Sequence, residues 1–305
     1  MQDNDSYNKP LHYFAIVVAI AVVLLITSGS IVTTIGAGLA VPDWPLSFGS
    51  VNPDGWWQDT PVRTEHGHRL VGATVGILTL ILFAWMLIVK APRSVRLAGG
   101  ICVVAVIVQG TLGGLRVTDR NIGFAMIHAC LAQAFFCLVV YLCVALSRGW
   151  TQHSIDPARP DRGIPRLLIA VVVGIYVQLI IGSIMRHTAA GLAIPTFPLV
   201  DGGLWPTQWT FPIAIHYVHR VWAGAIAILV IAAVTALQRR NCRGRAMAAA
   251  WLMLVLTIVQ LALGATIILT HRAAVPTSAH VVTGALLLAC SLYCLLWFSR
   301  DRSGP

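Results

Sequence analysis

Long apolar stretches separated by short polar segments dominate the chain. Eight of them reach the roughly 20 residues that a helix needs to cross a bilayer: about 11–35, 67–90, 97–117, 122–147, 165–186, 213–238, 246–270 and 276–298. Backbone amides and carbonyls in lipid must be hydrogen-bonded within the protein, so each stretch predicts a helix. The pattern therefore predicts an all-α polytopic membrane protein with eight transmembrane helices.

The pattern of the first four stretches recurs in the last four. The segment GLAVPDWPL from 38 matches GLAIPTFPL from 191, EHGHR at 65–69 matches HYVHR at 216–220, and VQGTLGG from 108 matches VQLALGA from 259. Four helices per half give both halves the same orientation, which makes the repeat a parallel one. We expect two tandem, pseudo-twofold-related four-helix bundles, residues 1–147 and 167–305, joined by a polar cytoplasmic linker at 148–166.

The composition supports a membrane protein, with 57% hydrophobic residues, 10% charged residues and a mean hydropathy of +0.80. A soluble domain does not have this composition. The net charge of +10 does not predict a nucleic-acid partner, because 14 of the 21 Lys and Arg residues lie on the side that also holds both termini. The positive-inside rule makes that side cytoplasmic. The seven cysteines lack metal-cluster spacing and are expected to be apolar packing residues.

Histidines gather at the opposite, outer side. His68 and His128 lie near the outer ends of the second and fourth predicted helices, and His219 and His280 repeat this placement in the sixth and eighth. A single histidine of this kind is most simply a helix-end residue bonded to a carbonyl. Two imidazoles at one depth on facing helices of an apolar bundle are instead typical of axial ligands to haem iron. No role is predicted for three further outer histidines, His66, His187 and His271.

Glu65 is the only glutamate of the chain, and the repeat places His216 at the matching position. Glu65 precedes His68 by three residues, so the two side chains share a helix face. A carboxylate there can act as an acid or base, or stabilise positive charge on a substrate. Helix capping is the simpler alternative. The asymmetry predicts two similar sites, of which the first is reactive.

Arginines near the outer helix ends are candidates for binding a carboxylate, such as a haem propionate, because a guanidinium is bidentate and always charged. Anchoring to lipid headgroups is the alternative. Two imidazoles with Glu65, or with His216, could instead hold zinc or non-haem iron. The candidate arginines are Arg69, Arg116, Arg220 and Arg272.

Taken together, these motifs resemble the haem A synthase family over nearly the whole chain, from GSIVTTIGAGLAVPDWPLSFG through EHGHR, VQGTLGGLRV and MIHA to IHYVHR, VQLALGA and SAH. The resemblance implies an enzyme that oxidises a ring methyl of haem O to a formyl group through hydroxylated intermediates. It implies that His68 and His128 flank the substrate haem, that His219 and His280 ligate a haem b, and that Glu65 is catalytic. His216 would support the haem b site.

The resemblance also implies partners: the farnesylated substrate haem O, the prenyltransferase that makes it, and an electron donor of unknown identity. One departure is that residues 37–64 lack the cysteine pair that some family members carry in this loop.

Two other functions stay open. A b-type cytochrome could carry electrons from quinol through two permanent haems, although it has no evident need for a carboxylate in one half only. A transporter is disfavoured because the ionisable residues cluster near one face, whereas transport sites lie at the midplane.

Overall fold

The computed structural model describes residues 7–152 and 163–300, and the regular structure of these residues is helical. Eight helices within these ranges are long and apolar enough to cross a membrane. The predicted all-α, multi-pass fold is therefore confirmed. The chain divides into two compact units, Met1–Ile155 and Asp156–Pro305. The pseudo-twofold relation between the two halves stays a prediction.

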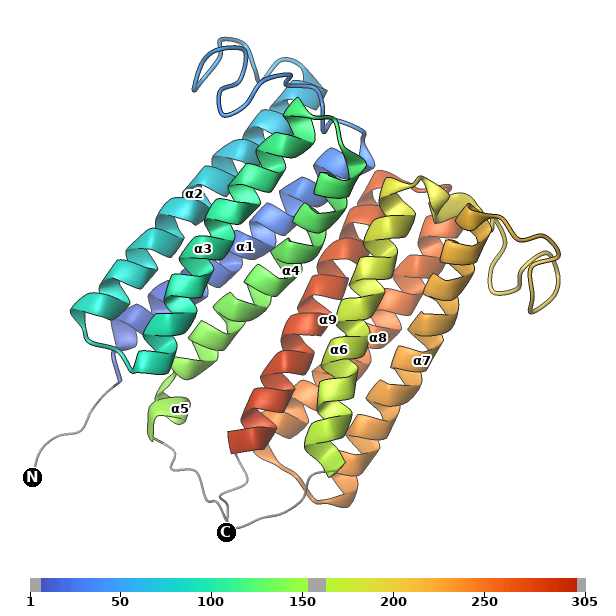
Figure 1. Ribbon diagram of the computed structural model, residues 1–305. Helices are drawn as coiled ribbons and strands as arrows, with labels where there is room; N and C mark the ends of the chain where they lie inside the picture. The colour runs from blue at the N-terminus through green and yellow to red at the C-terminus, as the bar shows by residue number, and fades with distance from the viewer. Residues whose placement is uncertain (1–6, 153–162, 301–305) are drawn as a thin grey trace, which may run out of the picture. The chain divides into compact units, whose positions relative to one another are not determined.

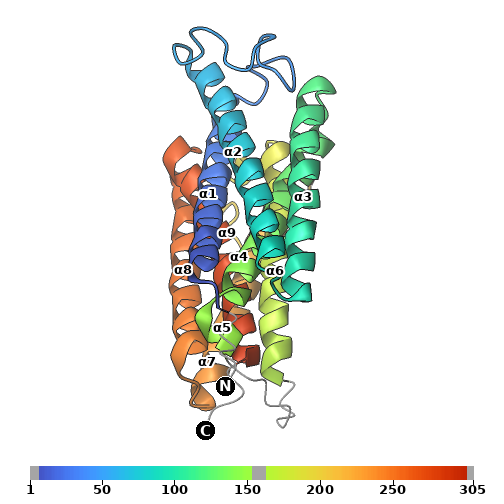
Figure 2. The same ribbon diagram turned by 90° about the vertical axis from the view of Figure 1, so that its left-hand side faces the viewer.

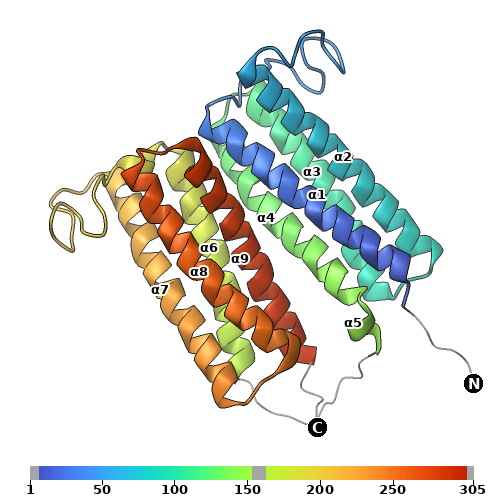
Figure 3. The same ribbon diagram turned by 180° about the vertical axis from the view of Figure 1, so that it is seen from behind.

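The first unit is a bundle of four long helices, in which each helix packs against the next and α4 returns to α1. The four run side by side in Figure 1 and in the view from behind (Figure 3). Fully buried apolar side chains fill its centre, among them Val18, Leu82 and Val139. Its helices are α1 (Lys9–Thr34), α2 (Thr60–Ile88), α3 (Arg93–Thr118) and α4 (Ile122–Ala145), followed by the short α5 (Arg148–Gln152).

The second unit repeats this neighbour order, with α9 returning to α6. Leu168, Val230 and Leu288 are fully buried in its core. The helices are α6 (Gly163–His187), α7 (Phe211–Arg239), α8 (Gly244–Leu269) and α9 (Ala274–Arg300), with a short 3-10 helix η1 (Ala190–Leu192) after α6. Of the predicted linker at 148–166, residues 153–162 lie outside the described residues; its two ends form α5 and the start of α6.

One helix begins well before the predicted start. The apolar pattern placed the start of the second span near residue 67, whereas α2 begins at Thr60. Asp59 occupies the N-cap position with an extended backbone, and Pro61 falls in the first turn, where proline is favoured. The polar residues that follow hid this start from hydropathy. Glu65 and His68 therefore lie inside the helix rather than at its first residues.

Each unit has one long loop, which connects its first long helix to its second. Residues 35–59 connect α1 to α2, and residues 188–210 connect α6 to α7. Figure 2 shows the first loop extending past the ends of α1 and α2. The two loops share details: an isolated bridge joins Ser47 to Ser50 in the first, and Val200 to Gly203 in the second. The repeat therefore extends from the helices into the loops.

The seven cysteines are free, and Cys102, Cys290 and Cys294 are buried. Cys290 and Cys294 direct their thiols at the carbonyls of Ala249 and Ala246 on the neighbouring helix α8. These positions agree with packing roles for the buried cysteines.

Candidate functional site

All four predicted ligand histidines pack edge-on against a glycine of the preceding helix. A methyl group added at Gly29 would come within 2.9 Å of His68 Cε1, and one added at Gly113 within 3.3 Å of His128 Cε1. In the second unit a methyl group added at Gly182 would lie 3.2 Å from His219 Cε1, and one added at Gly264 would lie 3.4 Å from His280 Cε1. A side chain at Gly29 would require the His68 ring to shift, and one at the other three glycines would crowd its imidazole. Each glycine thus lets an imidazole ring lie close to the backbone of the preceding helix.

In the first unit, the Nδ1 atoms of both histidines have hydrogen-bond partners. His128 Nδ1 lies 3.1 Å from the Gln109 carbonyl, which can only accept, so Nδ1 carries the proton. His68 Nδ1 lies 2.8 Å from Ser28 Oγ. When Ser28 donates its proton to the Leu25 carbonyl, at 2.9 Å, His68 Nδ1 is the donor to Ser28. Both rings then keep an unprotonated Nε2, the form that a metal-ligating histidine needs.

In the second unit the two rings face each other. The ring centroids of His219 and His280 are 6.3 Å apart. Two metal–nitrogen bonds of about 2 Å, with a ring radius of about 1 Å at each end, give about 6 Å between the centroids of two imidazoles on one metal. Both histidines line a cavity with apolar side chains and Gly264 around it. The spacing and the glycine-lined wall fit a flat ligand held between two axial imidazoles.

Arg220 lines this cavity and has one guanidinium nitrogen without a hydrogen-bond partner. Its Nε donates to His216 Nε2 at 3.1 Å and its Nη2 to the Ile194 carbonyl at 2.9 Å. Its Nη1 is buried without a hydrogen-bond partner, although the side chain lines the same cavity as the two histidines. A buried guanidinium N–H without a partner is costly. A carboxylate of a bound ligand, such as a haem propionate, would satisfy it.

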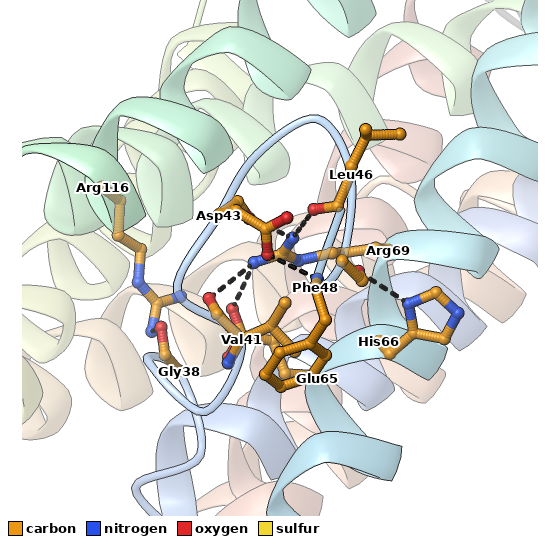
Figure 4. Close-up of polar contacts among 10 residues, drawn as sticks. Gly38, Val41, Asp43, Leu46, Phe48, Glu65, His66, Arg69 and Arg116 are labelled. Atoms are coloured by element: carbon orange, nitrogen blue, oxygen red, sulfur yellow. Dashed lines mark hydrogen bonds and ion pairs between the residues drawn. The ribbon is translucent and has the colours of Figure 1, made fainter. Parts of the chain in front are cut away.

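Glu65 is nearly fully buried, with 3% of its surface exposed, and both carboxylate oxygens are engaged. Oε2 accepts from the Val41 amide at 2.9 Å, and Oε1 pairs with Arg69 Nη2 at 2.9 Å. The residue lies beyond the first turn of α2 and contacts the outer loop instead of helix amides (Figure 4). The capping interpretation of Glu65 is therefore wrong.

The other candidate arginines bind loop backbone or lie beside it. Arg69 donates to the carbonyls of Val41, Asp43 and Leu46 as well as to Glu65 (Figure 4). Arg116, in the last turn of α3, donates to the Gly38 carbonyl at 3.3 Å. Arg272 follows the end of α8 and lies against Gly191, the repeat equivalent of Gly38.

The histidines without a predicted role differ in their surroundings. His66 is buried, its Nδ1 lies 2.8 Å from Ser47 Oγ, and Trp56 packs against its ring at 4.8 Å between centroids. It thus helps to hold the first loop. His187 is the last residue of α6, and His271 is exposed just past the end of α8.

In the first loop, backbone amides also bind the carboxylate of a loop residue, Asp43. The carboxylate of Asp43 accepts from the amides of Phe48 and Gly49, both at 2.7 Å. These amides, Gly49 first, lower the pKa of Asp43 below its usual value. In the second loop Thr196 Oγ1 accepts from the Asp201 amide at 3.2 Å, which is the equivalent contact without a charge.

A small metal cage finds no support in the geometry. Within residues 7–152 and 163–300, no three His, Cys, Asp or Glu side chains gather around a point that a metal ion could occupy. The donor set instead consists of paired imidazoles, glycine-lined walls and arginine, which suits an iron that arrives already held in a macrocycle.

Comparison with known proteins agrees with this chemistry. A family model described as "Cytochrome oxidase assembly protein" (COX15-CtaA) matches residues 12–292. The chain belongs to this family. The alignments with the three relatives named next cover 99%, 99% and 94% of those proteins. A protein named "Heme A synthase" from Alkalihalophilus pseudofirmus is 27% identical, with 96% of this chain and 99% of the relative covered. Proteins of the same name from Halalkalibacterium halodurans and Geobacillus kaustophilus are 26% and 28% identical, each over 97% of this chain.

The sequence predicted that His219 and His280 lie close together, as they do, but it did not predict the glycines beside the four histidines. The glycines at 29, 113, 182 and 264 lie at repeat offsets close to those of the histidines, so the spacing held the signal. It also missed the contacts of Glu65 and Arg69 with the first loop. These contacts join segments more than twenty residues apart, and nothing in the local pattern reports them.

Proposed function

We propose that this chain is a haem A synthase, which oxidises a ring methyl of haem O to a formyl group through hydroxylated intermediates. Membership in the family and the names of the relatives support the reaction class. The observation that carries the proposal is the repeated imidazole pair with an acidic residue in one half only. Two sockets of the same construction then do different work.

In this proposal His68 and His128 bind the substrate haem through Nε2, with Nδ1 held by Ser28 and the Gln109 carbonyl. Such outer hydrogen bonds orient a ligating imidazole and raise its basicity. Gly29 and Gly113 let the rings lie flat against the neighbouring helices.

His219 and His280 would hold haem b, and the unpaired Nη1 of Arg220 would donate to one propionate. When bound, this haem supplies one-electron transfer to the first site. His216 holds Arg220 in place from one helical turn away, through Nε2. Arg116 and Arg272 remain candidates for the other propionates, since each lies beside a loop glycine near the outer helix ends.

Glu65 is the proposed catalytic carboxylate. Glu65 is buried in a medium of low dielectric, where a carboxylate acts more strongly on developing positive charge than it would in water, and Arg69 is paired with one of its two oxygens. It can stabilise cationic character at the reacting methyl carbon or accept a proton from it. The matching His216 cannot do the first of these as a neutral imidazole, which is why we assign the chemistry to the first half.

We place the protein in the cytoplasmic membrane with both termini in the cytoplasm and both haem sites toward the outer face. The positive-inside distribution of Lys and Arg supports this orientation. Haem O is the substrate, and the enzyme that farnesylates haem and an electron donor are the proposed partners.

Haem extraction and chromatography of the purified protein test the function. We expect haem b together with farnesylated haems, and conversion of added haem O to haem A in membranes that contain the chain. Protohaem alone, without any conversion of haem O, would favour a b-type cytochrome, which the equal construction of the two imidazole sockets also allows.

A further inference from the structure

The two units hold their outer loops by the same three-residue contact. In the first, the Val41 amide donates to Glu65 at 2.9 Å, and the Val41 carbonyl accepts from Arg69 at 3.1 Å. In the second, the Ile194 amide donates to His216 at 3.2 Å, and the Ile194 carbonyl accepts from Arg220 at 2.9 Å. We call these sets the first clamp (Val41, Glu65, Arg69) and the second clamp (Ile194, His216, Arg220).

Each clamp is closed by a contact within its helix, because the arginine lies one turn after its partner. Arg69 pairs with Glu65 at 2.9 Å, and Arg220 donates to His216 at 3.1 Å. In the first clamp one loop residue is thus held at both its N–H and its C=O by a bonded pair, and the second clamp has the same geometry. Val41 and Ile194 are themselves buried, so water does not compete easily for these bonds.

Arg69 commits all its terminal N–H groups to this work. Nη1 donates to the carbonyls of Asp43 at 2.6 Å and Leu46 at 2.9 Å, while Nη2 serves Val41 and Glu65. Figure 4 shows the guanidinium of Arg69 lying inside the bend of the loop. A guanidinium has four terminal protons and one on Nε, so only the Nε–H of Arg69 is left outside these contacts. Arg220 differs, because its Nη1 is left over.

Glu65 and His216 differ in how many hydrogen bonds they can accept within their clamps. In each clamp two donors, a loop amide and the arginine, point at one side chain. A carboxylate offers an oxygen to each, and Glu65 does so. A neutral imidazole has one lone pair in its ring plane, yet His216 faces a donor at both Nδ1 and Nε2. The second clamp is therefore short of one acceptor.

We propose that Arg69 is a positioning residue, which through the first clamp fixes the Glu65 carboxylate and the outer loop above it, and that the second clamp is a weaker copy. The proposal rests on the proposed function only for what Glu65 then does. The clamp itself concerns hydrogen bonds of the loop, so it can hold or fail independently of haem oxidation. It also reassigns Arg69 from a propionate contact to a loop contact.

Amide hydrogen exchange of the haem-loaded full-length protein tests the first clamp, with the variants Arg69→Gln, Arg69→Lys and Arg63→Gln. Arg69→Gln should raise exchange across Val41–Leu46 by roughly tenfold or more, because the loop loses three bonds and Glu65 its partner. Arg69→Lys keeps a charge beside Glu65 but cannot bind three carbonyls, so we expect an intermediate increase. Arg63→Gln removes a charge from the exposed face of α2 and should change nothing in Val41–Leu46.

The haem b spectrum reports folding of the second unit, which holds its ligands, and slow amide exchange in the middle of α2 and α4 reports folding of the first unit in every variant. Haem A formation should fall in Arg69→Gln and recover in part in Arg69→Lys. Unchanged exchange of Val41–Leu46 in Arg69→Gln, with the haem b spectrum intact, would overturn the clamp. Increased exchange with no haem A made even by the unaltered protein would leave the clamp standing and refute the proposed function instead.

The second clamp is tested by His216→Glu, which supplies the missing acceptor, against Arg220→Gln, which removes the donor. We expect exchange at Ile194 to slow by several fold in His216→Glu and to accelerate in Arg220→Gln. Faster exchange in His216→Glu would show that the imidazole is the better acceptor and would refute the unequal match.

Discussion

At the scale of single residues, glycines control the orientation of the ligand imidazoles. Gly182→Ala should tilt His219, because the new methyl would lie 3.2 Å from its Cε1, and Gly264→Ala should disturb His280 less, at 3.4 Å. Since axial ring orientation sets the anisotropy of low-spin haem, electron paramagnetic resonance should show a larger shift for Gly182→Ala. Gly224→Ala in α7 is the control, because nothing lies within 4 Å of its added methyl. Equal spectra for all three variants would contradict this role.

The structure sharpens what a change at Glu65 should do. In Glu65→Gln the side-chain oxygen can still accept from the Val41 N–H. The contact with Arg69 is weakened, because the charge is lost and an NH2 group, which cannot accept, faces the guanidinium. If Glu65 acts chemically, haem A formation should fall by roughly a hundredfold or more, with haem O or a hydroxylated intermediate accumulating while haem b stays bound. Chromatography of extracted haems measures this.

The matched control for that change is His216→Gln. It should disturb the haem b environment through Arg220 without the same block in methyl oxidation. Normal haem A production by Glu65→Gln would remove the reason for calling the first half reactive. Comparison with Arg69→Gln separates loss of the carboxylate charge from loss of its position, since Glu65→Gln keeps Arg69 and its loop contacts, whereas Arg69→Gln keeps the carboxylate and removes the residue that positions it.

The paired histidines could be predicted from the sequence because the repeat presents each of them twice. Their orientation could not, since it depends on glycines of neighbouring helices, which a pattern along one chain does not connect to a histidine. The contacts of Glu65 were missed for a similar reason. Helix spacing correctly placed Glu65 and His68 on related faces, but the partner of the carboxylate is an amide 24 residues earlier in the chain.

At the scale of helices, the second site depends on α7 and α9 facing each other through His219 and His280. Replacing either histidine by Ala should remove the low-spin, six-coordinate signature of haem b, because one axial ligand is lost. Optical spectra of the purified variants measure this. His271→Ala, at an exposed position past α8, should leave the spectrum unchanged. Full retention of the signature by both variants would refute the assignment.

Hydropathy predicted every long helix and most of their ends to within a few residues, because a bilayer-spanning segment must be apolar. The early start of α2 was missed, since Arg63, Glu65 and His66 lower the hydropathy of a segment that is helical. Its cap residue and Pro61 carried the correct signal. The loop at 35–59 could not be predicted, because its shape follows from contacts with α2 rather than from its own composition.

At the scale of the whole chain, duplication explains why the two units share so much. Helix neighbours, histidine–glycine contacts, loop bridges and clamps recur at offsets of 151 to 153 residues. The differences concentrate in a few positions: Glu65 against His216, Asp43 against Thr196, and a fully committed Arg69 against Arg220 with one free donor. In the proposed function a common frame thus supports a reactive site in one half and an electron-transfer site in the other.

The orientation of the chain in the membrane decides which side the proposed haem sites face. The loops at 90–96 and 239–245 carry Lys90, Arg93 and Arg96 in the first half and four arginines in the second, so we expect both in the cytoplasm. Reporter fusions at these loops should be active only with a cytoplasmic reporter, and fusions within 188–210 only with an exported one. Each half has four spanning helices, which requires the two basic loops to report the same side. An exported reporter active at either basic loop would overturn the topology and, with it, the placement of both clamps and all four histidines toward the outer face.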